Sequence, residues 1–175
     1  GPFADAHAFV TDVSGAHAQL NLQGPRAREV LQTLTSVDLG NAALPFRAAR
    51  EIDIGYARLL CVRITYVGEL GWELYVPTAF TLPVYDALVT AGAEFGLRHC
   101  GYPTLNSLRI AKAYREWAHD IGPHDTPLEA GLGFTCAWDK AGGQQVVWHE
   151  IEVSFPRPRV LSLYVTPLDG EAAGT

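Results

Sequence analysis

The stretch that decides the fold runs from Arg63 to Pro77 and reads Arg-Ile-Thr-Tyr-Val-Gly-Glu-Leu-Gly-Trp-Glu-Leu-Tyr-Val-Pro. Apolar and β-branched residues run up to Val67 and alternate again after Gly71, which predicts two strands joined by a Gly-Glu-Leu-Gly turn. We expect Gly68 and Gly71 to supply positive φ angles in that turn. The stretch therefore predicts an antiparallel hairpin.

The second arm of this hairpin has two different faces. Because side chains alternate along a strand, Trp72, Leu74 and Val76 share one face, and Glu73 and Tyr75 lie on the other. A carboxylate among apolar neighbours is costly unless it faces water or meets a donor. Glu73 is therefore expected either on a solvated sheet face or in contact with a ligand, and periodicity alone favours the solvated face.

Strands and helices are interleaved along the rest of the chain. The patterns predict strands at 7–14, 17–22, 50–54, 58–67, 72–76 and 160–165, and helices opening at Pro25, running from Pro83 to Gly96, and running from Thr104 to about Arg115. This order indicates an α+β fold, with a mixed or antiparallel sheet and helices packed on it, rather than a parallel βαβ array.

Composition excludes several classes of function. The 175 residues include 48% hydrophobic and 18% charged residues, which is typical of a folded globular domain of ordinary size. A net charge of -6 without a cluster of Lys and Arg argues against nucleic-acid binding. We find no apolar run long enough to cross a bilayer, so no membrane partner is expected.

The cysteines and the first residues bear on the origin of the chain. Cys61, Cys100 and Cys136 are odd in number and far apart, which predicts reduced thiols rather than disulfides or a zinc site. Methionine is absent and the chain opens on Gly1-Pro2, so we expect a fragment, a processed terminus or a trimmed product.

The hairpin stretch also carries a resemblance. The sequence Tyr-Val-Gly-Glu-Leu-Gly-Trp-Glu at 66–73 resembles the signature of the aminomethyltransferase family, which includes the glycine cleavage T-protein and the folate-binding C-terminal region of sarcosine and dimethylglycine dehydrogenases. Further segments occur in the family's order, and they lie at 11–14, 22–31, 106–110 and 126–132. Tyr-Arg-Glu-Trp at 114–117 is more similar to the dehydrogenase branch.

The resemblance covers residues from about 10 to about 140 and implies two parts. Residues 1–140 are expected to form the folate-binding domain, incomplete at its N-terminus. Residues 141–175 are expected to be a linker and the start of a truncated barrel-like segment, because the pattern changes after Lys140.

The resemblance implies three residues that bind tetrahydrofolate. Glu73 would accept the ring N–H and the exocyclic amine of the pterin, Tyr66 would contact the flat ring, and Arg109 would take the carboxylates of the folate tail. Without the resemblance, Tyr66 is a core tyrosine. Arg109 is equally a buried ion pair, for example with Glu129, and Ala111 stands where many relatives have Glu.

Two other kinds of site are not supported by the sequence. His119, Asp120, His124 and Asp125 lie in one predicted loop, but their spacing matches no standard set of metal ligands. A Ser-His-Asp hydrolase is weaker still, because the chain has no Gly-x-Ser-x-Gly elbow.

The resemblance implies a role in one-carbon transfer. The family's catalytic aspartate lies upstream of Thr11-Asp12-Val13-Ser14, and neither Asp5 nor Asp12 matches its motif, so no catalytic residue is assigned. The chain would bind tetrahydrofolate and capture the one-carbon unit released from an N-methyl amine such as sarcosine or dimethylglycine.

The expected partners are a small-molecule folate and a flavin-dependent dehydrogenase domain, with FAD held in that other domain. Two alternatives stay open: a non-catalytic interaction or regulatory domain of the same fold, and a truncated remnant. We expect a cytoplasmic address, with the mitochondrial matrix as the alternative.

Overall fold

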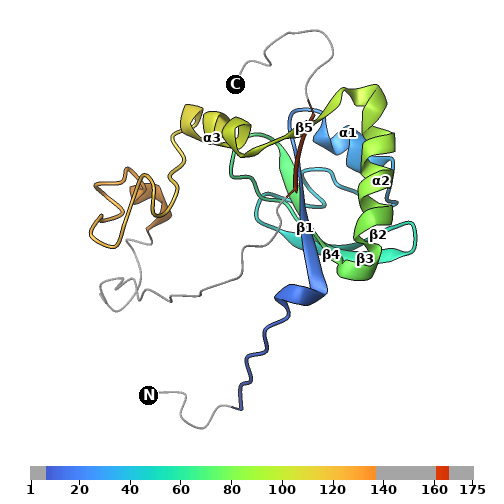
Figure 1. Ribbon diagram of the computed structural model, residues 1–175, viewed down its shortest axis with the longest axis horizontal. Coiled ribbons are helices and arrows are strands. Elements are labelled where there is room, and N and C mark those ends of the chain that lie inside the picture. The colour runs from blue at the N-terminus through green and yellow to red at the C-terminus, as the bar shows by residue number, and fades with distance from the viewer. Residues whose placement is uncertain (1–6, 137–160, 166–175) are drawn as a thin grey trace.

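The computed structural model describes residues 7–136 and 161–165, which form one sheet with helices beside it (Figure 1). The strands are β1 (His17–Gln23), β2 (Ala49–Ile54), β3 (Ala57–Val62), β4 (Gly71–Pro77), β5 (Leu97–Cys100) and β6 (Leu161–Val165). The α-helices are α1 (Ala27–Gln32), α2 (Thr81–Gly92) and α3 (Tyr102–Ala111). Short 3-10 turns lie at Ser14–Ala16, Thr78–Phe80, Ala93–Phe95 and Gly133–Thr135.

The sheet is mixed, and its strand order is β2-β3-β4-β1-β6-β5. β1 and β6 run parallel, whereas the other neighbouring strands pair antiparallel. The first strand of the chain therefore lies near the middle of the sheet. This arrangement confirms the predicted α+β class.

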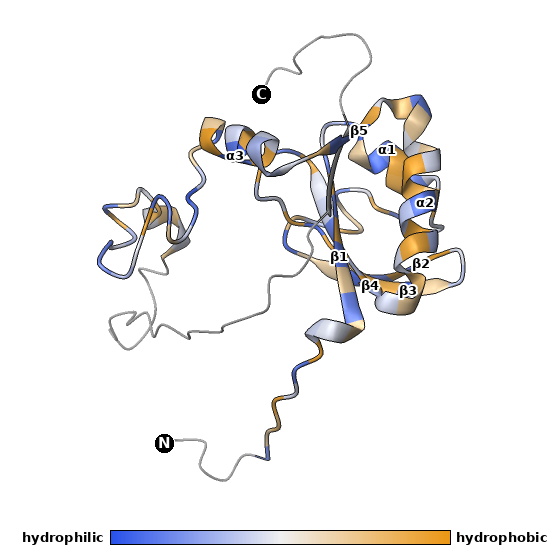
Figure 2. Ribbon diagram, viewed as in Figure 1, coloured by the Kyte–Doolittle hydropathy of each residue, from blue (hydrophilic) through white to orange (hydrophobic). Residues whose placement is uncertain are grey.

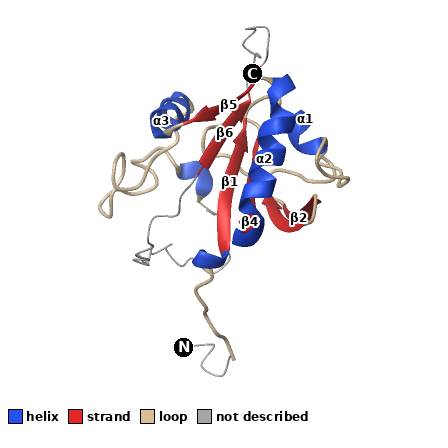
Figure 3. Ribbon diagram, turned by 45° about the vertical axis from the view of Figure 1, so that its right-hand side comes forward, coloured by secondary structure: helices blue, strands red, loops and turns tan. Residues whose placement is uncertain are grey.

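Helices α1 and α2 lie on the same side of the sheet, and α3 lies at the end of the sheet beside β5 (Figure 3). Apolar residues recur along α2, which shows orange segments turn after turn in Figure 2. Val84 and Leu88, one helical turn apart, are buried in the core cluster. The sheet is thus covered by these two helices on one face.

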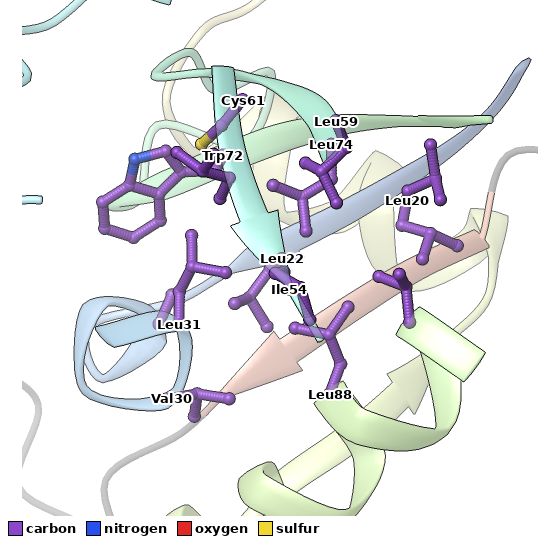
Figure 4. Close-up of a cluster of buried hydrophobic side chains, with 14 of the residues drawn as sticks. Leu20, Leu22, Val30, Leu31, Ile54, Leu59, Cys61, Trp72, Leu74 and Leu88 are labelled. Carbon is purple, nitrogen blue, oxygen red and sulfur yellow. The ribbon is translucent and has the colours of Figure 1, made fainter. Parts of the chain in front are cut away.

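The core fills the space between the sheet and these two helices (Figure 4). Trp72, Leu74 and Val76 are fully buried, as the alternation along β4 predicts. Leu20 and Leu22 of β1 and Val30 and Leu31 of α1 pack in the same cluster. Each large apolar side chain buried in this way contributes roughly 1.5–3 kcal/mol.

The connection between β3 and β4 is longer than the sequence predicts. β3 and β4 pair as an antiparallel hairpin with Val62 opposite Glu73, but segment 63–70 joins them as a loop. The tight turn is wrong because this loop folds toward α3 instead: Tyr66 bonds to Arg115, and Gly68 lies against the Lys112 side chain.

The two glycines of this loop differ. Gly68 has a φ of 71°, as predicted. Gly71 does not have a positive φ: it is the first residue of β4, where it lies opposite Gln23 of β1. A Cβ on Gly71 would overlap the carboxamide of the buried Gln23, so a larger residue here would require the Gln23 side chain to move.

The helix boundaries differ from the prediction by a few residues. α1 begins at Ala27, two residues after Pro25, and α3 begins at Tyr102 instead of Thr104. α3 ends at Ala111 because the chain turns at Ala113, which has a φ of 59°. A 3-10 turn follows α2, and Gly96 then ends the helical segment in the left-handed region.

Both ends of the chain also differ from the prediction in part. The predicted strand at 7–14 is absent from the structure, and its last residue opens the 3-10 turn Ser14–Ala16. The strand predicted at 160–165 is present as Leu161–Val165, and it pairs with β1 and β5 in the main sheet. The predicted linker at 141–159 and the tail at 169–175 lie outside the described residues, so the division near residue 140 stays a prediction. None of the described helices has the length and apolar character needed to cross a membrane.

Candidate functional site

The face of the sheet opposite α1 and α2 is polar along β1 and β4. Gln19, Asn21 and Gln23 alternate with the buried leucines of β1, and Glu73 and Tyr75 alternate with the buried residues of β4. The Gln19 Nε2 donates to Asn21 Oδ1 at 3.4 Å. We call these five residues the polar face.

Glu73 is half-buried at the centre of the polar face. Asn21 of β1 lies opposite it on one side and Val62 of β3 on the other. Its Oε2 accepts a hydrogen bond of 2.7 Å from the Tyr75 hydroxyl. Among the described residues, none donates a hydrogen bond to Oε1. The carboxylate therefore keeps one oxygen available to an incoming donor.

The sequence pattern placed Tyr75 on the same strand face as Glu73 but assigned no function to Tyr75. Burial, and then the hydrogen bond to the Glu73 carboxylate, raise the pKa of the Tyr75 phenol to about 12. The phenol is therefore a neutral donor at physiological pH. The spacing of two residues on one strand was the signal that could have identified the pair.

A pocket of about 400 Å³ lies next to Tyr75 on the same side of the sheet. Its lining includes His17, Leu60 and Pro77. Arg58 and Glu51, which also line it, form an exposed ion pair of 2.6 Å. The pocket gives the open side of β4 a concave, partly apolar surface.

Tyr66 lies in a second cluster, formed by the loop 63–70 and the segment after α3. Its hydroxyl donates to the Arg115 carbonyl at 2.9 Å. The Arg109 Cζ lies 5.8 Å from the centroid of the Tyr66 ring, and the Tyr114 ring centroid lies 6.3 Å from it. The structure thus brings Tyr66 and Arg109 together, as a cation-π pair.

Arg109 is 3% exposed, and acceptors of its own segment surround its guanidinium. Nη2 donates to Glu116 at 2.8 Å, and Nη1 forms an ion pair with Asp120. The remaining bonds are from Nε to Asn106 at 2.7 Å and from Nη1 to the Tyr114 carbonyl at 3.1 Å. Four of the five guanidinium N–H groups are therefore used, and a two-point grip on a ligand carboxylate would require the exchange of one of these partners.

Arg109 pairs with Glu116 and Asp120, and not with Glu129, which the sequence suggested. Glu129 instead accepts the Thr126 N–H at 3.0 Å, and this bond lowers the pKa of Glu129. The N–H of Glu116, followed by the Arg109 guanidinium, lowers the pKa of Asp120. The expected partner Glu129 is wrong, because the turn at 126–129 caps its own backbone.

The three residues that the resemblance implicates therefore fall into two groups. Glu73 pairs with Tyr75 on the polar face, and Tyr66 packs with Arg109 near α3. No hydrogen bond or ring contact within the described part of the chain joins Glu73 to Tyr66. Glu73 fits a ligand that offers two adjacent N–H donors, since its Oε1 has no donor from a described residue. The binding roles of all three stay predictions.

The loop with two histidines and two aspartates does not gather a metal site in the described residues. Asp120 accepts from Arg109, and Asp125 accepts the Gly122 N–H at 2.7 Å. No group of three or more possible ligands forms anywhere in 7–136 or 161–165. The three cysteines are free thiols, as predicted.

Comparison with known proteins identifies the family of this α+β domain. The family model described as "GCVT N-terminal domain" matches residues 3–140. The chain belongs to this family, which confirms the resemblance carried by the hairpin stretch.

The chain is similar to three kinds of relative. Mouse mitochondrial sarcosine dehydrogenase is 46% identical over 125 residues, which are 71% of this chain and 14% of that protein. The aminomethyltransferase of Geobacillus thermodenitrificans is 36% identical over 157 residues, 88% of this chain and 43% of that protein. The mouse mitochondrial pyruvate dehydrogenase phosphatase regulatory subunit is 36% identical over 128 residues, 73% of this chain and 15% of that protein. The chain thus spans about 14% of the sarcosine dehydrogenase.

Proposed function

We propose that this chain is a tetrahydrofolate-binding domain of a one-carbon transfer protein. It would capture the one-carbon unit released from an N-methyl amine such as sarcosine or dimethylglycine. The proposal is supported by membership of the family and by the relatives' names, which include a sarcosine dehydrogenase and an aminomethyltransferase.

The observation that carries this proposal is the Glu73 carboxylate on the polar face. It is half-buried between strands, so part of its hydration is lost, and its Oε1 has no donor from the described residues. A pterin edge offers a ring N–H beside an amine, and a carboxylate accepts both. Glu73 would thereby select a pterin over a flat ring without these donors.

The other predicted residues would act on the same ligand from the second cluster. Tyr66 would contact the ring, and its position is set by the bond to Arg115 and by the guanidinium of Arg109. Arg109 would meet the tail carboxylates if Glu116 or Asp120 gave way. Tetrahydrofolate, when bound, supplies the nitrogen that accepts the one-carbon unit. The chain's contribution is to hold that nitrogen in a fixed position.

A second candidate is a non-catalytic regulatory domain of the same fold. It is favoured by the 36% identity to the phosphatase regulatory subunit. The two candidates differ in one property, because the regulatory role needs no folate affinity. The presence of a flavin-binding region in the full open reading frame would favour the enzyme.

Calorimetric titration of the chain with folinic acid tests the proposal. Glu73→Ala should weaken binding by roughly thirty-fold to nearly a thousand-fold, because a buried pterin edge loses its acceptor. Glu94→Gln removes an exposed carboxylate of the turn after α2 and should leave the affinity unchanged. A folded chain that does not bind at millimolar ligand would favour the regulatory role.

The partner and the compartment belong to the same proposal. A flavin-dependent dehydrogenase domain, with its own FAD, would supply the one-carbon unit. The mammalian relatives are named as mitochondrial proteins, which supports the mitochondrial alternative and gives no support to a cytoplasmic address.

A further inference from the structure

The Tyr75 hydroxyl is the one described donor that reaches the Glu73 carboxylate. The bond to Oε2 is 2.7 Å long, an ordinary length for an O–H···O hydrogen bond and within the range of bonds to an ionised carboxylate. The opposite residue on β3 is Val62, which has no polar side chain. Asn21, opposite on β1, accepts from Gln19 through its Oδ1, and no hydrogen bond among the described residues joins its Nδ2 to Glu73.

Both residues of the pair are fixed by the backbone of β4. Glu73 and Tyr75 are two residues apart on one strand, so they lie on the same face. Their neighbours Trp72, Leu74 and Val76 are fully buried, which prevents the strand from rotating. The remaining freedom of Glu73 lies in its side-chain torsions, and the bond from Tyr75 restricts these.

We propose that Tyr75 is a positioning residue for ligand binding: its hydroxyl occupies Oε2 of Glu73 and turns Oε1 toward the open side of the sheet. This inference rests on the proposed function. To accept both pterin donors, the two carboxylate oxygens must lie in the plane of the pterin ring. The Tyr75 hydroxyl uses one lone pair of Oε2, and the second lone pair of Oε2 stays available to the ligand. Pre-orientation of this kind reduces the entropy lost on binding.

A pocket lies beside Tyr75 on the open side of the sheet, and Tyr75 but not Glu73 is among the described residues that line it. Tyr75 borders that pocket of about 400 Å³, so its ring is in contact with the open side of the sheet. The hydroxyl thus connects the pocket wall to the carboxylate. His17, Glu51 and Arg58 also line the pocket, and they are unchanged in all the variants below.

A double-mutant cycle measured with folinic acid tests this role. Tyr75→Phe should weaken binding about ten-fold, because one charge-assisted bond that orients Glu73 is lost. The same change in a Glu73→Gln background should cost less than about three-fold, since the neutral amide gains little from the phenol. A tyrosine that only supported the strand would cost the same in both backgrounds.

Tyr56→Phe is the matched control for the loss of a hydroxyl. Tyr56 is fully exposed in the turn between β2 and β3, so the affinity and the melting temperature should not change. An equal affinity of Tyr75→Phe and the wild-type chain would overturn the inference and leave the proposed function standing. An absence of wild-type binding would overturn both.

A measurement without ligand checks the bond itself. The Tyr75 phenol, whose pKa is about 12, should titrate at a lower pH in Glu73→Gln when followed by tyrosinate absorbance against Tyr75→Phe. An identical titration in Glu73→Gln would show that the hydroxyl does not bind Glu73 in solution, and the inference would fail.

Discussion

Arg109 joins α3 to the segment that follows it, through one buried guanidinium. Glu116 and Asp120 are 17% and 34% exposed, so a part of their charge would stay buried without Arg109. Arg109→Leu should therefore lower the free energy of unfolding by about 2–3 kcal/mol, less than for a fully buried pair. Urea unfolding followed by tryptophan fluorescence measures this change.

Arg58→Leu is the control for the loss of an arginine at the surface. Arg58 pairs with Glu51, but both side chains are mostly exposed, at 71% and 60%. The solvent screens this pair, so the midpoint of unfolding should hardly move. If Arg109→Leu and Arg58→Leu lowered the free energy of unfolding equally, the buried ion pairs of Arg109 would stabilise the fold no more than an exposed ion pair does.

Cys61 is the thiol that burial should protect from reagents. It is completely buried in the core, and this burial raises the pKa of the thiol to about 12. Ellman's reagent at pH 8 should therefore leave Cys61 unmodified while Cys100 and Cys136, which are half-buried, react. Mass spectrometry of the labelled peptides measures this, and unfolding in guanidinium should make Cys61 react. Labelling of folded Cys61 at the rate of Cys100 would contradict the burial.

At the residue scale, the sequence predicted which side chains share a strand face better than it predicted which side chains bond to each other. Alternation placed Glu73 and Tyr75 on one face, which the structure confirms. The bond between them depends on side-chain torsions, which no periodicity specifies. For Arg109 the sequence suggested Glu129, although Thr-x-x-Glu at 126–129 is itself the pattern of a capping box, which binds Glu129 to its own turn. Choices among nearby acids depend on tertiary structure.

At the scale of elements, the contact between α2 and β5 depends on the absence of a side chain at Gly92. A Cβ at Gly92 would meet the Leu97 Cβ at 2.6 Å, and Leu97 is buried. Gly92→Ala should therefore destabilise the fold by about 1–3 kcal/mol through overpacking, although Ala is the better helix former. Thermal unfolding followed by circular dichroism measures the effect.

Gly15→Ala serves as the control for this change. A Cβ at Gly15 would have nothing within 4 Å, so this variant should unfold at the wild-type temperature or slightly above it. Adding Leu97→Ala to Gly92→Ala removes the overlap with the Leu97 Cγ and Cδ1 but keeps the Leu97 Cβ, so it should recover only the part of the packing loss that those outer atoms cause. A stabilised Gly92→Ala variant would show that Leu97 moves aside without cost.

The elements that the sequence predicted well are those with strong local patterns. β4, β2 and α2 lie close to their predicted positions because alternation or helical spacing defines them. The loop 63–70 was predicted as strand and tight turn, since its apolar residues fit a strand locally. Contacts with Lys112 and Arg115, more than forty residues later, decide its conformation instead.

At the scale of the whole molecule, several carboxylates are held ionised by bonds that exist only in the folded chain. Hydrogen bonds lower the pKa of Glu29 through Arg26, and of Asp120 through the Glu116 N–H and then Arg109. A group with a lowered folded pKa stabilises the fold above its ordinary pKa. The urea concentration at the midpoint of unfolding should therefore decrease as the pH is lowered below about 4, near the ordinary pKa of 3.8 for Asp. Asp120→Asn should make this fall shallower, and an unchanged acid limb would contradict the role of Asp120.

The alkaline limb has the opposite sign, because burial raises the pKa of the groups involved. Cys61 shifts from 9.0 to about 12, so its proton is retained in the folded chain and lost from the unfolded one. The stability linked to this proton is complete below pH 9 and declines as the pH rises toward 12, at up to about 1.4 kcal/mol per pH unit. Urea unfolding at pH 8, 10 and 11 should show this decline. Cys61→Ala should be less stable at pH 8 but should lose less of its stability between pH 9 and 11. Equal slopes in the two proteins would mean that Cys61 ionises as readily in the fold as in the unfolded chain, which its burial against Trp72 and Leu74 does not allow.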